Sequence, residues 1–252
     1  MNILVGTSGW SYKEWKGSFY PARIPAEEML RFYAGHFPAV EVNNSFYRIP
    51  AERVLATWAE QVPDTFRFIM KASRRVTHNS RLRDEDGSLG YFLRAINPLG
   101  HRLGPTLFQL PPTFKKDLDR LRRFLGALPL RWPAAMEFRH PSWFVDEVYD
   151  ALRERNVALV AVDEDEAEGA GSPLVSTASW GYLRLRRSVY EDTRLGEWAA
   201  RIRANPWTDA YVFLKHQDGS PTGPAAAAHM LRVLGQPSPN VTSVTTPTHP
   251  SG

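Results

Sequence analysis

The sequence predicts one α/β domain, a closed (β/α)8 barrel of parallel strands with helices around it. Short apolar runs alternate with amphipathic stretches along most of the chain, a pattern typical of parallel strands joined by helices. The chain has 252 residues, which is a usual length for one such barrel. An open doubly wound sheet is the alternative that this pattern leaves.

Short apolar runs are the predicted strands. They cover residues 3–5, 39–43, 66–71, 106–110, 134–139, 158–163, 181–186 and 210–215. Each run leads into a helical pattern or a long connection, so we expect all of them to point in the same direction.

The predicted helices lie between these runs. The first opens at Pro25, with Glu27 and Glu28 in its first turn, where proline and acidic side chains favour a helix start. Another is expected over 88–96. Apolar residues at helical spacing mark the remaining helices. These are Val54, Leu55, Trp58 and Val62; Leu118, Leu121, Leu125 and Leu128; Val145, Val148 and Leu152 after a cap near Ser142; Leu195, Trp198 and Ile202; and the alanine-rich stretch 224–234.

Two segments depart from the pattern. Residues 164–180 carry acidic side chains and glycines but no helical periodicity, which predicts a functional or mobile loop. Residues 235–252 are rich in Pro, Ser and Thr, and such a composition buries too little apolar surface to become ordered. We therefore predict a barrel domain over residues 1–234 and a disordered tail over 235–252.

Composition restricts the chemistry and the location. The chain has no cysteine, which excludes disulfides, zinc–cysteine sites and thiol catalysis. Its N-terminus lacks a basic leader, and no apolar run is long enough to span a membrane. We expect a cytoplasmic protein without a membrane partner. The net charge of +4 is compatible with a polyanionic partner.

Polar side chains gather at the predicted strand ends. In a (β/α)8 barrel the active site lies at the carboxyl ends of the strands, and alternate residues of each strand face the interior. On the parity that we expect to face the interior, the polar residues near the carboxyl ends of the predicted strands are Glu41 and Asn43, Lys71, Gln109, Glu137 and Arg139, Asp163, Arg184, and Lys215. Because buried charges are costly without a purpose, we expect a polar top-face cavity whose excess of cations binds an anion. The alternative is that these charges pair with one another and line a wet barrel mouth.

Aromatic residues in the neighbouring loops are further candidates. The glycine-rich loop after the first strand contains Ser8, Trp10 and Tyr12, and Tyr47 and Trp143 follow the second and fifth strands. Aromatic faces can stack on a base or a sugar. They can equally pack the loops together as a lid.

The loop 71–83 is basic. It holds four arginines and no acidic residue, and arginine forks suit phosphate and carboxylate groups. It also contains His78, and the ordinary pKa of histidine near neutrality suits proton transfer. The alternative is an ordinary solvated charged surface.

Several motifs occur together in a fixed order. They are Gly6-Thr7-Ser8-Gly9-Trp10-Ser11-Tyr12 with Trp15-Lys16-Gly17 and Phe19-Tyr20-Pro21; Glu41-Val42-Asn43 with Phe46-Tyr47-Arg48; Lys71 with Thr77-His78; Gln109-Leu110-Pro111-Pro112; Glu137-Phe138-Arg139-His140 with Ser142-Trp143; and Asp163. This combination resembles the YecE-like family, also called domain of unknown function 72. The resemblance covers roughly residues 3–234 and leaves the tail outside. It implies a TIM-type barrel and no settled activity.

Several reaction classes fit the strand ends poorly. A glycosidase needs two carboxylates across the scissile bond. Glu137 and Asp163 could form such a pair, but Gln109 and Arg184 stand where many barrel glycosidases carry carboxylates. A metal site would need several His, Asp and Glu ligands, and the neighbouring cations would crowd it. A strand-end lysine could form a Schiff base if desolvated, but an electrostatic anchor is its simpler role.

The class that fits best is acid–base chemistry, without metal or cofactor, on a small anionic substrate such as a phosphorylated sugar or a nucleotide. A hydrolase, lyase or isomerase would fit this description. The predicted acid–base residues are Glu137, with Asp163 or Glu41 as its partner, and His78. The predicted substrate-binding residues are Lys71, Arg139, Arg184, Asn43, Gln109, Ser8, Trp10, Tyr12, Tyr47, Trp143 and Lys215.

Two alternatives stay open. The first is a protein that binds or processes nucleic acid through the basic loop 71–83 and surface aromatics, with an affinity that falls steeply with salt. The second is a ligand sensor without catalysis.

Overall fold

Each predicted apolar run forms a strand. The computed structural model describes residues 1–83, 87–165, 171–215 and 222–237. Within these ranges the strands are β1 (Asn2–Ser8), β2 (Ala39–Val42), β3 (Arg67–Met70), β4 (Thr106–Gln109), β5 (Ala134–Glu137), β6 (Ala158–Asp163), β7 (Trp180–Leu185) and β8 (Asp209–Leu214). Neighbouring strands pair in parallel.

The two ends of the sheet meet, so the strands form a ring. The order is β3-β2-β1-β8-β7-β6-β5-β4. Strands β3 and β4 approach through isolated bridges from Phe68 to Leu103 and from Lys71 to Leu107. Ala72 N also donates to Leu107 O at 2.8 Å. This circular order confirms the predicted barrel, whereas an open doubly wound sheet would reverse its strand order at a switch point.

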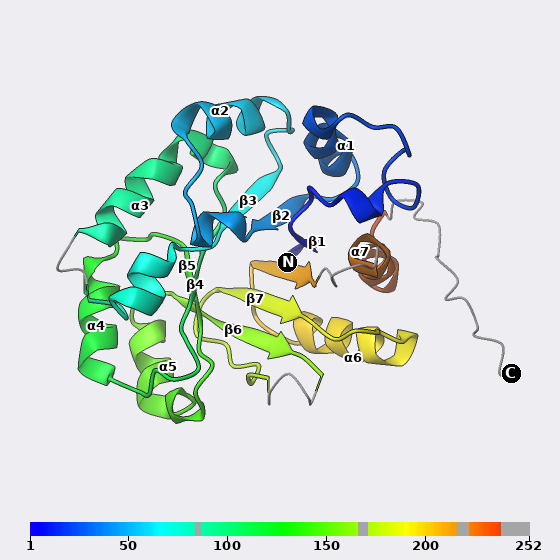
Figure 1. Cartoon of the computed structure of the whole chain (residues 1–252). Coiled ribbons are helices and arrows are strands. Elements are labelled where there is room, and N and C mark those ends of the chain that lie inside the picture. Colours follow the sequence, from blue (N-terminus) through cyan, green and yellow to red (C-terminus); the bar gives the residue numbers. More distant parts are fainter. Residues whose placement is uncertain (84–86, 166–170, 216–221, 238–252) are drawn as a thin grey trace, which may run out of the picture.

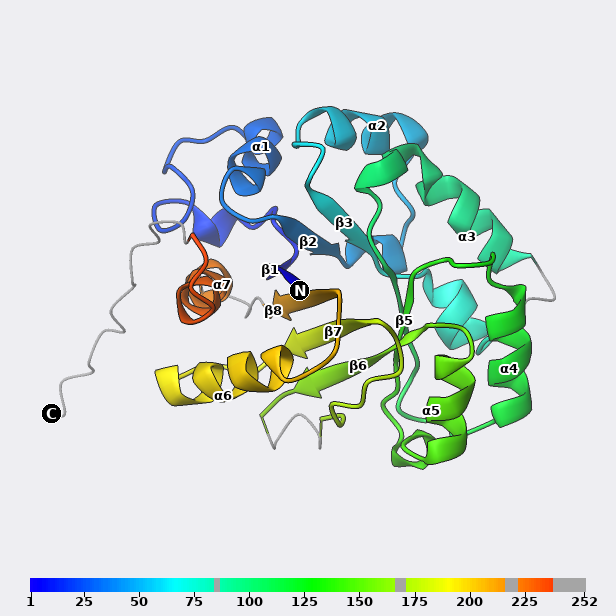
Figure 2. The ribbon, with the colours of Figure 1, turned by 180° about the vertical axis from the view of Figure 1, so that it is seen from behind.

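Helices surround the ring, as the opposite views in Figures 1 and 2 show. They are α1 (Met29–Ala34), α2 (Glu52–Glu60), α3 (Ser88–Ile96), α4 (Leu118–Ala127), α5 (Asp146–Arg153), α6 (Asp192–Arg203) and α7 (Thr222–Val233). Short 3-10 turns occur at η1 (Lys13–Trp15), η2 (Ala26–Glu28), η3 (Asn44–Phe46), η5 (Asn97–Arg102) and η6 (Pro141–Trp143). The helix predicted from Pro25 therefore begins as η2 and continues as α1. The basic loop contains a π-helical turn, η4 (Arg75–Asn79), a feature frequent at functional sites.

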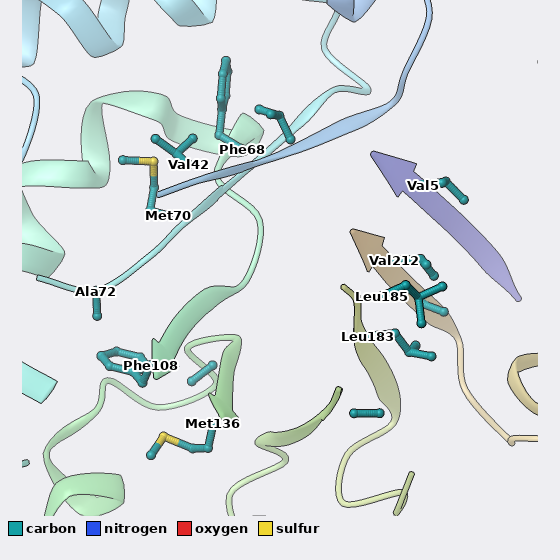
Figure 3. Packing of buried hydrophobic residues seen from close by; sticks show 14 of the residues in the cluster. Val5, Val42, Phe68, Met70, Ala72, Phe108, Met136, Leu183, Leu185 and Val212 are labelled. Atoms are coloured by element: carbon teal, nitrogen blue, oxygen red, sulfur yellow. The ribbon is translucent and has the colours of Figure 1, made fainter. Parts of the chain in front are cut away.

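Apolar side chains fill two layers and leave the polar ones at one end. Side chains of one parity, such as Phe68 and Leu183, pack between the strands and the helices, and Figure 3 shows part of this layer. Side chains of the other parity, such as Leu4, Ile69 and Phe213, fill the barrel interior. Burial of this surface is the main force that closes the barrel. The polar residues at the carboxyl ends of the strands thus lie next to a tightly packed apolar interior.

The two irregular segments are described in part. Residues 171–179 contain no helix, and Ser172 Oγ donates to Val160 O at 2.6 Å, which ties this loop to β6. Residues 166–170 and 238–252 lie outside the described residues. Gln236 Nε2 donates to Ile3 O at 3.2 Å. The domain boundary at 234 and the disordered tail stay predictions. No helix of the described residues is long and apolar enough to cross a membrane.

Candidate functional site

Arg184 is the centre of a buried charge network at the carboxyl ends of the strands. Its side chain is 2% exposed. Nη1 donates to Glu137 Oε2 at 2.7 Å and Nη2 donates to Glu41 Oε1 at 2.8 Å. The guanidinium thus bridges two carboxylates from β2 and β5 across the barrel. This geometry uses the planar fork that lysine lacks.

Glu41 is held ionised by several donors. Ser8 Oγ, Asn43 Nδ2 and Tyr182 OH donate to its carboxylate at 2.8, 3.0 and 2.7 Å. Burial alone would raise the pKa of Glu41, but Arg184 and these hydrogen bonds outweigh it and lower the pKa to about 2. Glu41 is therefore a fixed negative charge rather than a proton donor near neutrality.

Glu137 is similarly fixed and is linked to Lys71. Gln109 Nε2 donates to Glu137 Oε1 at 2.7 Å, and Lys71 Nζ donates to Gln109 Oε1 at 2.8 Å. Burial opposes ionisation of Glu137, but Arg184 and Arg186 outweigh it and lower its pKa. A carboxyl group in this state is a poor general acid. Glu137 lies in this network, and its electrostatics favour a role as a charged support.

A looser outer ring surrounds this network. Arg139 Nε lies 3.9 Å from Glu137 Oε1, and Arg139 Nη2 lies 3.8 Å from Glu164 Oε2. Arg186 Nε lies 4.0 Å from the same Glu164 oxygen. These separations exceed hydrogen-bond distance. Within the described part of the chain, Arg186 Nε and Glu164 Oε2 are buried without a hydrogen-bond partner.

Lys71 and His78 both contact the Phe46 ring. Lys71 Nζ is 4.6 Å from the ring centroid, and the imidazole is edge-on to it at 4.8 Å between centroids. Burial and Arg184 lower the pKa of Lys71 to about 8. Burial and Lys71 lower the pKa of His78 below its ordinary value. At neutral pH Lys71 is therefore a protonated amine that loses its proton more readily than an ordinary lysine, and it lies beside a neutral imidazole.

Asp163 does not join this network, and the parity predicted for β6 is wrong. Val160 and Val162 face the interior, while Asp163 points to the helix layer. There Trp198 Nε1 donates to its carboxylate at 2.7 Å, and Arg194 and Arg187 donate at 2.9 and 2.8 Å. Asp163 is thus a structural link from β6 to α6. The glycosidase pair considered for Glu137 and Asp163 is not formed.

The predicted aromatic residues separate into three environments. Trp143 is fully buried, stacked on Phe138 at 4.6 Å, so its ring offers no surface to a ligand. Tyr47 is 74% exposed. Trp10 and Tyr12 line a cavity beside the network, together with Asn43.

Lys215 directly follows β8 and lies outside the bonded network. It lines a separate cavity of about 300 Å³ with Arg187, Tyr190 and His229.

The hydrogen-bonded network brings together seven of the predicted residues: Ser8, Glu41, Asn43, Lys71, Gln109, Glu137 and Arg184. Arg139 lies at its rim.

Sequence reasoning missed two charged residues of the mouth, Arg186 and Glu164. Arg186 continues the inward parity of Tyr182 and Arg184 by one more step, so this alternation was the available signal. Glu164 follows the inward Val162 in the same way. Among the described residues, His, Asp and Glu form no group of three that could hold a metal ion.

The fold and this mouth define a class of protein: an α/β barrel of TIM type with a buried Glu–Arg–Glu bridge at the carboxyl ends of its strands. A family model described as "Protein of unknown function DUF72" matches residues 4–251, and the chain belongs to this family. The match continues past residue 234, so the prediction that the tail lies outside the family resemblance is wrong.

The relatives agree with this assignment. The UPF0759 protein YecE of Escherichia coli K12 is 33% identical over 174 residues, which cover 67% of this chain and 61% of that protein. The UPF0759 protein YunF of Bacillus subtilis 168 is 33% identical over 156 residues, covering 59% of this chain and 54% of that protein. The chain thus matches less than two thirds of the length of these curated relatives.

Solved structures share the fold. A DUF72 family protein of Thermotoga maritima matches with a TM-score of 0.78 and 27% identity, over 94% of this chain and 100% of that one. A DUF72 family protein of Enterococcus faecalis V583 matches with a TM-score of 0.77 and 20% identity, over 97% of this chain and 99% of that one.

Proposed function

We propose that the barrel mouth binds the anionic group of a small substrate and carries out acid–base chemistry on it without a metal. The observation that carries this proposal is the loose outer ring of cations. Arg139 and Arg186 share one distant carboxylate, Glu164, and the buried Nε of Arg186 has no hydrogen-bond partner within the described residues. A phosphate or carboxylate oxygen would supply this missing acceptor.

The charge balance of the mouth supports an anion. Glu41 and Glu137 are already engaged by Arg184, and Glu164 faces two arginines. Lys71 adds a further cation whose partner is the neutral Gln109. Burial and Arg184 lower the pKa of Arg186, so the cations disfavour one another. A bound anion would relieve this repulsion.

Lys71 and His78 are the proposed proton-transfer residues. A group whose pKa lies near the working pH transfers protons most effectively, and perturbed pKa values cluster at functional sites. Lys71, with a pKa of about 8, would donate a proton. His78, neutral near pH 7, would accept one. Glu137 and Glu41 would hold Arg184 in place rather than exchange protons.

Calorimetric titration tests the anion site. Inorganic phosphate, phosphorylated sugars and nucleotides would be titrated into the protein, with their unphosphorylated counterparts as controls. We expect saturable binding only where an anionic group is present. If no anion binds, the charges are a structural network and the proposal fails. Binding without turnover of any bound compound would favour the ligand sensor.

Nucleic-acid binding is a second candidate, because one surface combines rings and arginines. Tyr47, Arg48, Arg75 and Tyr91 line a cavity of about 550 Å³, and Tyr47 and Tyr91 are 74% and 61% exposed. Exposed rings beside arginines suit a single strand. Affinity for a single-stranded oligonucleotide would fall steeply with salt and depend on both tyrosines. A small anion would instead bind independently of Tyr47 and Tyr91.

A further inference from the structure

A larger cavity lies beside the charge network, between α1 and α2. Its volume is about 630 Å³, within the range of small-molecule sites. One face of α2 lines it through Val54, Thr57 and Trp58, and Gln61, which caps the carboxyl end of the helix, continues the same helical spacing. The loop after β1 and the end of β2 complete the wall. Of the residues in the charge network, Asn43 is the one that also lines this cavity.

The wall of this cavity combines rings with apolar surface. Trp10 meets Trp58 edge-on, with ring centroids 4.8 Å apart. Tyr12 also lines the cavity, and its hydroxyl donates to Ser8 O at 2.9 Å, which fixes the ring. Val42 and Leu30 add aliphatic surface. Such a wall favours a compact ring-shaped ligand over a free inorganic ion.

Gln61 indicates what that ligand must carry. Its side-chain oxygen is buried and, among the residues that the structure describes, has no hydrogen-bond partner. A buried acceptor without a donor destabilises a fold, so such atoms are rare. A hydroxyl or amino group of a ligand in the cavity would supply the donor.

The charges of the wall point to a neutral group. Glu27 and Arg53 are the charged residues that line the cavity, and their charges are opposite in sign. The cavity therefore has no excess of either charge, unlike the barrel mouth. Asn43 connects the two regions, because it lines the cavity and donates to Glu41 Oε1 at 3.0 Å.

We propose that this cavity binds a neutral ring bearing hydroxyl or amino groups, as found in sugars and nucleosides, and that Gln61 accepts a hydrogen bond from it. The ring would be one end of the substrate whose anionic end lies at the barrel mouth. The second statement rests on the proposed function, whereas the ring site does not.

Ligand-observed NMR titration separates the two statements. Adenosine and uridine form one arm, glucose and ribose another, and inorganic sulfate probes the mouth. We expect at least one neutral compound to bind the wild type. Gln61→Met should weaken that binding about fivefold, the loss expected for one neutral hydrogen bond, and leave sulfate binding unchanged. Arg186→Met should do the reverse.

Two further measurements keep the test decisive. Ala26→Trp places a bulky ring in the cavity from an exposed position, so it should block the neutral compound and keep the melting temperature. Gln61→Met should keep or raise the melting temperature, because it removes an unpaired buried acceptor. Sulfate binding without any neutral binding would overturn the ring site and retain the proposed function. Neutral binding that neither variant changes would also overturn the assignment to this cavity.

Discussion

Arg184 on β7 donates to Glu41 on β2 at 2.8 Å, although β1 and β8 separate these strands in the sheet. The bond therefore crosses the barrel interior, and the two side chains are 2% and 0% exposed. A buried ion pair of this kind adds little over an apolar pair of the same shape, but removal of one partner leaves an uncompensated charge. The bridge therefore matters to stability mainly through the cost of losing one of its partners.

Arg184→Met tests the structural role of this bridge. The variant leaves Glu41 and Glu137 buried without their common cation, so we expect a loss of about 3–5 kcal/mol in the free energy of unfolding. Chemical denaturation measures it. Arg139→Met is the matched control, because this side chain is about a third exposed and should change stability by less than about 1 kcal/mol. Equal stability of both variants would contradict the bridge as a structural element.

Glu41→Gln gives a pH test of the same network. The pKa of Glu41 in the folded protein is about 2, below its ordinary 4.5. The ionised carboxylate therefore stabilises the fold fully above about pH 4.5, and this contribution is lost as the pH falls towards 2. We expect Glu41→Gln to lower the free energy of unfolding by roughly 3 kcal/mol at pH 7. The difference from wild type should shrink below pH 4.5; a difference that is constant with pH would contradict the ionised state.

The barrel and most of its mouth were predictable because strand alternation and barrel geometry constrain each other. Glu41, Gln109, Glu137 and Arg184 each end a strand on the parity opposite to a strongly apolar neighbour. For those strands, the side chains that face the barrel interior could therefore be predicted from sequence alone.

Strand β6 gives no such signal. Ala158–Val162 is apolar on both faces, as expected for a strand buried between the interior and a helix. Asp163 was therefore assigned to the barrel interior, whereas it lies on the helix face of β6, where Trp198 and Arg194 donate to it. Trp143 was misjudged for a similar reason, since a tryptophan that fills a loop core and one that stacks on a ligand look alike in sequence.

Arg186→Met tests the anion site directly. A charge-assisted hydrogen bond to a bound oxyanion contributes about 1.5–3 kcal/mol, so we expect anion affinity to fall at least about tenfold. Arg139→Met should produce a loss of similar size. Calorimetric titration with inorganic phosphate measures both, and Arg123→Met, exposed on α4, is the control. Unchanged affinity in both mouth variants would place the anion elsewhere.

Lys71 should make anion binding dependent on pH. Its pKa of about 8 means that the ammonium loses its charge as the pH rises through 8. Sulfate is the suitable probe, because its own charge is constant in this range. We expect sulfate affinity to fall about tenfold between the charged and neutral states of Lys71. In Lys71→Met the affinity should be low and independent of pH over this interval; a persisting pH dependence would point to another group.

Deprotonation of Lys71 should change the stability of the fold in the opposite direction from its effect on anion binding. The folded pKa of Lys71 lies below its ordinary 10.5, so between pH 8 and 10.5 the unfolded chain binds more protons than the folded one. The contribution of this lysine to the free energy of unfolding therefore rises with pH across that window. Comparison of wild type with Lys71→Met isolates it.

Asp163→Asn distinguishes a structural carboxylate from a catalytic one. The carboxylate accepts hydrogen bonds from Arg187, Arg194 and Trp198 on the helix side of β6. An amide accepts on one side only and places its NH2 group against these donors, so we expect the free energy of unfolding to fall by about 1–3 kcal/mol. Anion binding at the mouth should stay within about twofold of wild type, because the side-chain hydrogen bonds of Asp163 go to Arg187, Arg194 and Trp198, and its contact with Arg186 is made by the backbone carbonyl, which the substitution keeps. Denaturation and sulfate titration of the same preparation measure both. Loss of anion binding at unchanged stability would show that Asp163 serves the site, and the face assigned to it would have to be revised.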